Sequence, residues 1–504
     1  MLTRRSLVTG LAASVASRAA NGQRPNFIFL LADDHAGYVL GCDGNRQAET
    51  PNLDRLAAES VRFARHYCNS PMCTPSRQSL FTGQLPHAVG VTLLSTPLAE
   101  DKPTLAQQFQ QAGYRTAVFG KMHFNRPGRD GLFGLDTCMT EDAITREWNR
   151  ESPARTVPPA IPTKPPWRPF QDPARIWLNA DKLPYPRYES DMRGTFIARQ
   201  AIRYLQDCKR DGRPFALWIS FQEPHSPFDF PVDDRDRFDP AAFPPPPLGP
   251  DDASQTPEVF RDLTDADKRG IIAAYYTSVR FLDRNIGSVL HQLAELALDR
   301  NTLLIYTADH GYFLGQHGRF EKHHGYDPAL RVPLLMRWPG RIKPAIVRDL
   351  TEHVDVPATV TDLLELAPLP VQHGRTLRPH LEGGRVATPR RYIFAEYLET
   401  GQAYVRTSRH KFIYCSGKRL DWYRPVEPVA GRWHRLYDLK RDPDEFHDIA
   451  GRSPELVRQF EALLLDRFRK THPDSAGEPA GLDPESALDF YLRPRDLPNL
   501  PIIR

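Results

Sequence analysis

The chain has 504 residues, of which 40% are hydrophobic and 25% are charged, with a formal net charge of +4 at pH 7. This composition is typical of a globular protein with a large core, and the near balance of charges excludes the strong positive field with which nucleic-acid-binding proteins attract their partners. Beyond the N-terminal segment, no stretch approaches the roughly 20 apolar residues that span a bilayer, so we expect no stable membrane insertion.

Residues 1–20 have the pattern of an export signal. Two adjacent arginines in residues 3–7 (TRRSL) precede a mild apolar run at 7–16, and small residues near Ala20 suit cleavage. Paired arginines before a weakly apolar run are typical of a twin-arginine signal, with a Sec-type leader as the alternative. We therefore expect an exported protein, periplasmic or secreted. Because this segment carries three arginines and no acid, the mature chain is almost neutral.

Apolar runs alternate with amphipathic segments through residues 21–387. Mostly apolar runs are expected as buried parallel strands; they lie at 26–32, 114–120, 215–221 and 303–308. Helical faces lie between them, near 196–205 and 271–293. This alternation predicts an α/β fold with a large, mostly parallel sheet sandwiched by helices.

Two proline-rich segments interrupt this alternation, at 151–187 and 240–250. Proline is excluded from helix interiors and central strands. We expect irregular excursions there, which either line the mouth of a site or are solvated surface.

The pattern changes near residue 388. Residues 391–397 and 404–414 are expected to form antiparallel strands, and 455–470 a helix. We predict one main domain at 21–387 and a smaller C-terminal α+β subdomain at 388–504.

Acidic residues directly follow two of the expected strands. Asp33 and Asp34 come after the first strand, and Asp309 and His310 come after the strand that ends at residue 308. The carboxyl ends of parallel strands meet at one edge of a sheet, where unpaired carboxylates would repel one another. A divalent cation resolves that repulsion: oxygen ligands favour Ca²⁺ or Mg²⁺, and the imidazole leaves Mn²⁺ open. For either pair alone, a helix cap or turn is the alternative.

Basic residues follow the other expected strands. Lys121 and His123 come after residues 114–120, His225 follows 215–221, and Lys322 lies beyond Asp309. Together with a metal, these side chains could hold a tetrahedral oxyanion. Each taken singly would be an ordinary surface residue.

A five-residue motif at 73–77 (CTPSR) has the spacing Cys-x-Pro-x-Arg. Further motifs, in chain order, are 24–26 (RPN), 50–54 (TPNLD), 120–123 (GKMH), 309–311 (DHG), 331–333 (RVP), 353–355 (HVD) and 436–439 (LYDL). In this order they resemble the type I sulfatases of the alkaline phosphatase superfamily, over nearly the whole chain from residue 24. Two departures stand out: Met122 replaces a common Trp, and His310 stands where Asn is frequent.

The resemblance implies an alkaline phosphatase-like fold and a hydrolase of sulfuric esters, with residues 21–387 as its catalytic domain. It implies that a formylglycine-generating enzyme oxidises Cys73 to formylglycine. The implied metal ligands are Asp33, Asp34, Asp309, His310 and the modified Cys73, with Ca²⁺ as the expected ion and Mg²⁺ or Mn²⁺ as alternatives.

Roles for the remaining site residues follow from this chemistry. Arg77 lies four residues after the cysteine, on the same face of an expected helix, and is expected to hold the aldehyde hydrate. Lys121 and Lys322 are expected to bind oxyanion oxygens. His123 is the expected base for the second hydroxyl, and His225, together with Lys322, the expected acid for the leaving alcohol.

The expected substrate is a sulfated saccharide, with choline sulfate and aryl sulfates as alternatives. Arg319, His323 and His324 are candidates for contacting it, or else form a structural turn. A phosphonate monoester or phosphodiester hydrolase with the same nucleophile is the rival enzyme. An inactive homologue that binds sulfated glycans is the rival from another class.

Overall fold

The computed structural model describes residues 24–165, 173–384, 386–420, 429–496 and 502–503. Its largest element is an eight-stranded sheet. In spatial order the strands are β10 (Ala345–Val347), β2 (Val61–Phe63), β9 (Leu334–Arg337), β7 (Thr302–Ala308), β1 (Asn26–Ala32), β6 (Phe215–Ser220), β4 (Arg115–Gly120) and β5 (Thr137–Met139). All neighbouring strands pair in parallel except β9, which is antiparallel to β2 and to β7. The predicted mostly parallel sheet is confirmed.

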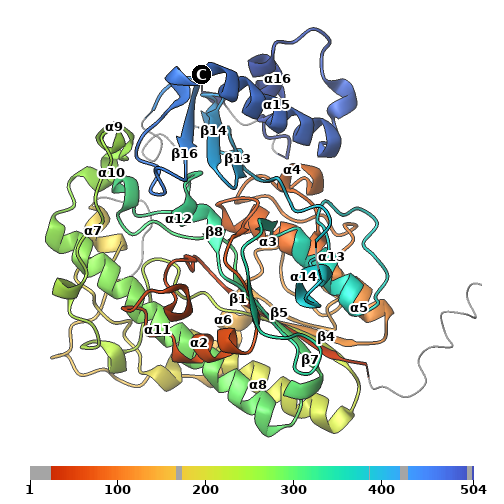
Figure 1. The fold of residues 1–504 in the computed structure, drawn as a ribbon. Helices are drawn as coiled ribbons and strands as arrows, with labels where there is room; N and C mark the ends of the chain where they lie inside the picture. The colour runs from red at the N-terminus through yellow and green to blue at the C-terminus, as the bar shows by residue number, and fades with distance from the viewer. Residues whose placement is uncertain (1–23, 166–172, 385, 421–428, 497–501, 504) are drawn as a thin grey trace, which may run out of the picture.

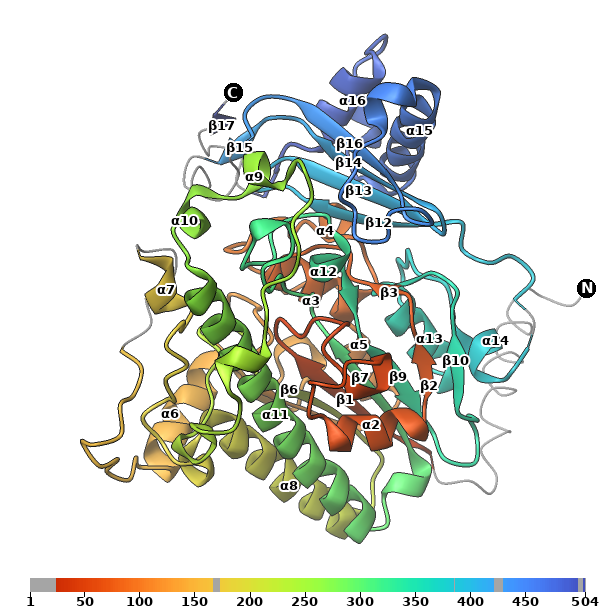
Figure 2. The ribbon, with the colours of Figure 1, turned by 60° about the vertical axis from the view of Figure 1, so that its left-hand side comes forward.

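Helices cover both faces of this sheet (Figures 1 and 2). Successive side chains of a strand point to opposite faces, so Phe27, Phe29 and Leu31 enter one core while Ile28 and Leu30 enter the other. The first core is completed by α3 (Cys73–Thr82), α5 (Leu105–Gln111) and α13 (Asp355–Leu363). The second is completed by α2 (Pro51–Ala58), α8 (Arg193–Asp211) and α11 (Asp265–Glu295). Burial on both faces explains why these strands are mostly apolar.

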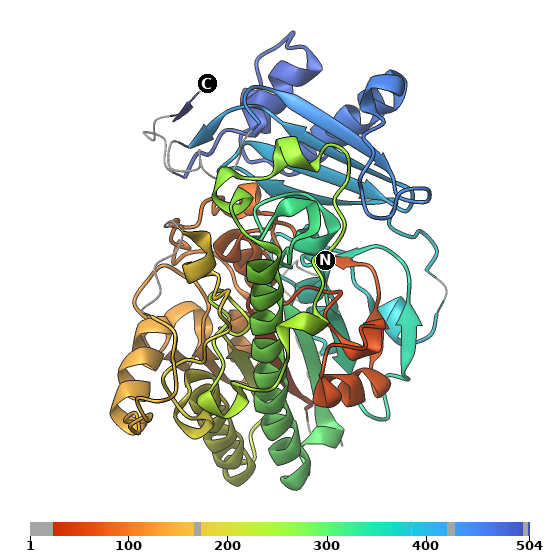
Figure 3. The ribbon, with the colours of Figure 1, turned by 90° about the vertical axis from the view of Figure 1, so that its left-hand side faces the viewer.

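The C-terminal part forms a second, antiparallel sheet with the order β12 (Tyr392–Tyr397), β13 (Gln402–Thr407), β14 (His410–Cys415) and β16 (Trp433–Asp438). Two helices, α15 (Pro454–Thr471) and α16 (Pro484–Tyr491), pack on its outer face. The inner face packs on the larger part of the chain through Tyr326 and Tyr404, among others. Figure 3 shows this subdomain seated over one end of the larger unit. The predicted α+β subdomain and its helix at 455–470 are confirmed.

The expected single strand at 404–414 is instead a hairpin of β13 and β14. The side chain of Thr407 explains the turn, since its Oγ1 accepts hydrogen bonds from the backbone amides of Arg409 (3.2 Å) and His410 (2.9 Å). The predicted export signal lies outside the described residues. The first strand of the subdomain begins at Tyr392, and the boundary at residue 388 stays a prediction. Among the described helices, none has both the length and the apolar character to cross a membrane.

Candidate active site

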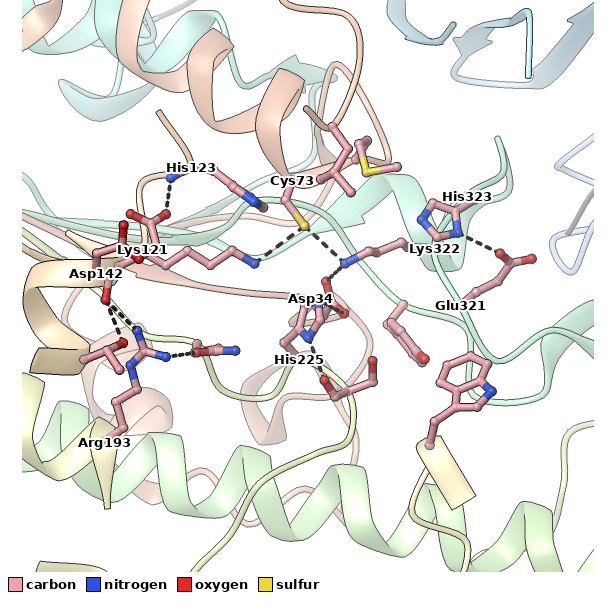
Figure 4. A pocket seen from close by; sticks show the side chains of 18 residues that line it. Asp34, Cys73, Lys121, His123, Asp142, Arg193, His225, Glu321, Lys322 and His323 are labelled. Atoms are coloured by element: carbon pink, nitrogen blue, oxygen red, sulfur yellow. Dashed lines mark hydrogen bonds and ion pairs between the residues drawn. The ribbon is translucent and has the colours of Figure 1, made fainter. Parts of the chain in front are cut away.

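Cys73 is the first residue of α3 and lies at the carboxyl edge of the central sheet, 2% exposed. Its Sγ lies 3.1 Å from Lys322 Nζ, 3.2 Å from His310 Nε2 and 3.8 Å from Lys121 Nζ (Figure 4). Burial alone would raise the pKa of the thiol, but Lys121 and Lys322 outweigh it and hold that pKa well below its usual range. The surroundings therefore stabilise a negatively charged group at this position.

Carboxylates alternate with these cations around the cysteine. Asp33 follows β1, and its carboxylate accepts a hydrogen bond from the ammonium group of Lys121. Lys322 Nζ lies 2.7 Å from Asp34 Oδ1. The backbone of Asp34 has φ 66°, a left-handed conformation that costs a non-glycine residue of order 1 kcal/mol or more. Because of that conformation, the side chains of Asp33 and Asp34 both point into the same site although they are consecutive in sequence.

Arg77 links helix α3 to the residues that follow strands β1 and β7. It is 1% exposed, its Nε donates to Asp309 Oδ2 at 2.8 Å, and its Nη2 lies 3.3 Å from Asp33 Oδ1. A further donor, Nη1, binds Ser220 Oγ at 2.9 Å. Lys121, Lys322 and Arg77 thus face three aspartates, which keeps the charges of the buried centre nearly balanced.

The residues of the site fit a divalent cation. Asp33, Asp34, Cys73 and His310 are all buried, and each offers one ligand atom within 4.8 Å of the others. Asp34 Oδ2 is buried and forms no hydrogen bond with the described part of the chain, which leaves a carboxylate oxygen available to an ion. Two carboxylates, an imidazole and the sulfur of Cys73 make a mixed set of oxygen, nitrogen and sulfur ligands.

The predicted ligand Asp309 stands directly beside this group of four. Its Oδ1 accepts from the backbone amides of Asp34 (3.1 Å) and His310 (2.9 Å), and its Oδ2 accepts from Arg77. Burial raises the pKa of Asp309 to about 6, although Arg77 opposes that rise. Burial would also lower the pKa of His310, but Asp309 and Cys73 raise it to about 9. The carboxylate of Asp309 is thus oriented by three donors.

A cavity of about 480 Å³ opens over Cys73. Lys121, His123, His225 and Lys322 all line it, so the structure brings together every side chain expected to handle the oxyanion. Burial and Lys121 lower the pKa of His123, so its imidazole is neutral and able to accept a proton. His225 Nε2 lies 4.0 Å from Asp34 Oδ2, and its Nδ1 lies 2.7 Å from the Ser226 carbonyl oxygen.

Of the three residues suggested for substrate contact, only His323 lines this cavity. Its Nδ1 is held by Glu321 Oε2 at 2.8 Å. His324 is stacked between Tyr326 (ring centroids 4.4 Å apart) and Trp433 (5.9 Å). Arg319 is fully buried and donates to Glu321 and to a backbone carbonyl. His324 therefore packs between the two parts of the chain, whereas Arg319 makes these contacts within the larger part.

Sequence reasoning missed several side chains of the cavity. Glu141 Oε1 accepts from the backbone amides of Met122 (3.1 Å) and His123 (2.5 Å), which fixes the loop after β4. Arg193 donates to Gln222 Oε1 at 2.8 Å. The remaining walls include Asp142, Thr145, Trp177 and Tyr312. Trp177 comes from the first proline-rich excursion; the other residues had no sequence signal, because their role depends on which elements fold next to the strand ends.

Comparison with known proteins agrees with this geometry. The family model described as sulfatase matches residues 25–366, and a second model, for the C-terminal part of N-sulphoglucosamine sulphohydrolase, matches residues 315–470. An arylsulfatase of Clostridium perfringens is 30% identical over 455 residues, covering 84% of this chain and 90% of that protein. A choline-sulfatase of Rhizobium meliloti is 26% identical and covers 90% of this chain and 87% of that protein.

Solved structures share the fold. The phosphonate monoester hydrolase of Agrobacterium radiobacter aligns with a TM-score of 0.73 at 22% identity, over 90% of this chain and 97% of that one. A 2-O glycosaminoglycan sulfatase aligns with a TM-score of 0.66 at 24% identity, over 92% of this chain and 96% of that one. Since the sulfatase model covers well over half of the sequence and a related arylsulfatase is similar over most of its length, this chain belongs to the sulfatase family and is a hydrolase of sulfate esters.

Proposed function

We propose that the protein removes sulfate from a sulfated saccharide by means of a formylglycine made from Cys73. The observation that carries this proposal is the position of the Cys73 side chain at the floor of the cavity, within 3.2 Å of both His310 Nε2 and Lys322 Nζ. In the active enzyme an oxygen of the modified residue takes the place of Sγ. The hydrate of that aldehyde supplies two hydroxyl groups on one carbon, one to attack sulfur and one whose deprotonation releases sulfate.

The divalent cation, for which Ca²⁺ is our choice, would be held by Asp33, Asp34, His310 and the modified Cys73, with Asp309 alongside. When bound it supplies positive charge that lowers the pKa of a nearby hydroxyl and neutralises sulfate oxygens. Mg²⁺ and Mn²⁺ are the alternatives.

The protein's own side chains then divide the work of binding and proton transfer. Lys121 and Lys322 bind the sulfate oxygens from two sides, and Arg77 keeps Asp309 and Asp33 oriented. His225, whose Nε2 lies near Asp34 Oδ2, protonates the oxygen of the departing alcohol. His123, whose imidazole is neutral, takes the proton from the second hydroxyl. Acid and base assistance of this kind contributes roughly 10²–10⁴-fold each.

The walls of the cavity support a sugar ring as the leaving group. Trp177 and Tyr312 offer aromatic surface, while Asp142, Arg193 and Gln222 offer hydrogen-bonding groups. Apolar ring faces stacked on aromatic side chains and hydroxyls bound by fixed polar groups are the usual means of holding such a ligand. Smaller aryl or choline esters would leave much of the space unfilled.

The modification is tested on a single tryptic peptide, residues 66–77. It contains Cys68 as well as Cys73, and Cys68 is buried with its Sγ against the Ala329 carbonyl oxygen. After alkylation of thiols, we expect a mass spectrum in which Cys68 is alkylated and position 73 has exchanged sulfur for oxygen. Cys73→Ala should abolish sulfatase activity while the matched Cys68→Ala retains it. An active protein that carries only the Cys73 thiol would refute the proposal.

The substrate class is tested separately, by comparing kcat/KM for sulfated monosaccharides, choline sulfate and an aryl sulfate. We expect the saccharides to be preferred, and Trp177→Ala to weaken that preference without changing aryl sulfate turnover. If a phosphonate monoester or phosphodiester is turned over faster than any sulfate ester, the result would favour a phosphonate monoester or phosphodiester hydrolase. The imidazole of His310 beside Cys73 is the reason for testing this alternative.

We also propose export by the twin-arginine route. That route carries folded proteins, so the modification of Cys73 by a formylglycine-generating enzyme would precede export. Replacing Arg4 and Arg5 by Lys should leave active, modified enzyme in the cytoplasm. Secretion of unmodified protein, modified only outside, would contradict this order.

A further inference from the structure

A second group of ligand-type side chains lies in the C-terminal subdomain, on elements that contribute nothing to the cavity over Cys73. His434 comes from β16, Glu461 from α15 and Glu485 from α16. Each offers one ligand atom, and the three atoms lie within 4.8 Å of one another. One imidazole and two carboxylates therefore converge from three separate elements.

The side of the sheet on which they meet is the outer one. Along β16, Trp433 stacks against His324 and Arg435 Nη1 donates to Tyr326 Oη at 3.2 Å, so these residues face the catalytic part. His434 and Leu436 alternate with them and face α15, where Leu436 joins the core under that helix. Figure 2 shows α15 and α16 on the side of the sheet turned away from the central strands.

Glu461 is the unusual member of the group. It is only 7% exposed, and within the described part of the chain its carboxylate has electrostatic partners in His434 and Arg458 but no hydrogen bond. Its neighbours along the helix, Phe460, Leu464 and Leu465, are buried in the apolar core. Burial raises its pKa, with His434 acting in the opposite direction. An acid in such a place costs free energy unless a cation or a hydrogen-bond donor compensates it.

Arg458 acts on the Glu461 carboxylate electrostatically, but its Nη2 binds Glu455 Oε2 at 2.5 Å. Arg432 is on the surface and binds Glu485 Oε2 (2.5 Å) and Asp489 Oδ2 (2.6 Å), both on α16. It makes no ion pair with Glu461, and it uses only one oxygen of Glu485. The other oxygen of Glu485 stays available beside His434.

We propose that His434, Glu461 and Glu485 form a second metal site, for Zn²⁺, which ties the edge strand β16 to α15 and α16. An imidazole nitrogen with two carboxylate oxygens suits Zn²⁺, which binds such ligands at about 2.0–2.2 Å and accepts water in the fourth position. In a tetrahedron of that size the ligand atoms are roughly 3.5 Å apart, so small side-chain rotations close the present spacing. The site is structural, because it joins three elements and lies outside the catalytic cavity.

The test uses the full-length enzyme, stripped with a chelator and then given Zn²⁺ alone. Diffraction data collected above and below the zinc absorption edge should show an anomalous peak bonded to His434, and His434→Ala should lose that peak while keeping any zinc bound at Asp33 and His310. The control is His291→Ala, because His291 is an exposed histidine of α11. We expect the affinity of the second site to fall by at least about 100-fold in His434→Ala, a larger loss than outer-shell changes produce, and to be unchanged in His291→Ala.

Glu461→Gln keeps the shape of the side chain and removes its charge, so it distinguishes loss of the metal site from a folding defect. Without metal this variant should unfold at a higher temperature than the wild type, and zinc should no longer raise its Tm. Equal zinc content in the wild type and His434→Ala would overturn the proposal. So would an anomalous map with zinc only at the Cys73 centre, or a zinc-dependent Tm rise that survives in Glu461→Gln.

Discussion

Replacing Arg77 by Met tests whether the buried charges of the site are balanced as the structure indicates. Arg77 is 1% exposed and binds Asp309 Oδ2 (2.8 Å), Ser220 Oγ (2.9 Å) and Asp33 Oδ1 (3.3 Å). Removing one partner of a buried ion pair costs about 3–5 kcal/mol, a large share of the roughly 5–15 kcal/mol that stabilises a typical domain. We expect that loss in the free energy of unfolding at pH 8, measured by urea denaturation of metal-free protein.

The loss should depend on pH. Burial raises the pKa of Asp309 to about 6 even though Arg77 lowers it, so without the arginine the pKa of this carboxyl rises further. A carboxyl whose folded pKa is above its unfolded value contributes stability at low pH and loses it as pH rises through the folded pKa. Arg77→Met should therefore be destabilised less at pH 5 than at pH 8.

Arg390→Met is the matched control for this prediction. The side chain of Arg390 is 8% exposed and pairs with Glu352 (3.2 Å) and Asp355, in a network that does not touch Cys73. We expect a similar loss of stability but retained activity below the unfolding temperature, whereas Arg77→Met should be inactive. An unfolding free energy for Arg77→Met within about 1 kcal/mol of wild type at pH 8, or the same loss at both pH values, would refute the reasoning.

Two further predictions concern single side chains. His225→Asn should lower kcat roughly 10²–10⁴-fold for a sugar sulfate, whose alkoxide needs a proton, and far less for an aryl sulfate with a good leaving group; equal losses would exclude His225 as the acid. Burial raises the pKa of Glu399 from 4.5 to about 8, against hydrogen bonds from Leu94 and Tyr397. Its stabilising effect is complete below pH 4.5 and is lost as pH rises to 8, which at about 1.36 kcal/mol per pH unit amounts to about 5 kcal/mol. Glu399→Gln should remove most of that slope in denaturation measured from pH 5 to 9, and an unchanged slope would contradict the assignment.

Much of the fold could be predicted because its strands are buried on both faces. The runs at 26–32, 215–221 and 303–308 are mostly apolar, the strands that they form are buried at every position, and the structure places each within one residue of its expected limits. The β13–β14 hairpin was missed because a two-residue turn between two largely buried strands leaves little trace in hydrophobic periodicity, and the hydrogen bonds of Thr407 mark it only in the structure.

The residues of the candidate site also fall into two groups, those that the sequence could predict and those that it could not. Residues at the ends of the strands, such as Asp33, Lys121 and Asp309, could be named from the sequence because parallel strands end at a common edge. Glu141 and Arg193 could not be named, because they reach the cavity from the first turns of α6 (Glu141–Glu151) and α8, and nothing in their local sequence differs from a solvated helix start.

The sequence by itself therefore determined the position of Cys73, the strand ends around it and the family of the enzyme. Only the tertiary structure decided which charges compensate which: Arg77 meets Asp309 across 232 positions of the chain, and His434 meets Glu461 on another element. Local sequence encodes secondary structure and short motifs through periodicity and turn chemistry. The balance of buried charges depends instead on contacts between distant segments, which exist only after the two cores have packed.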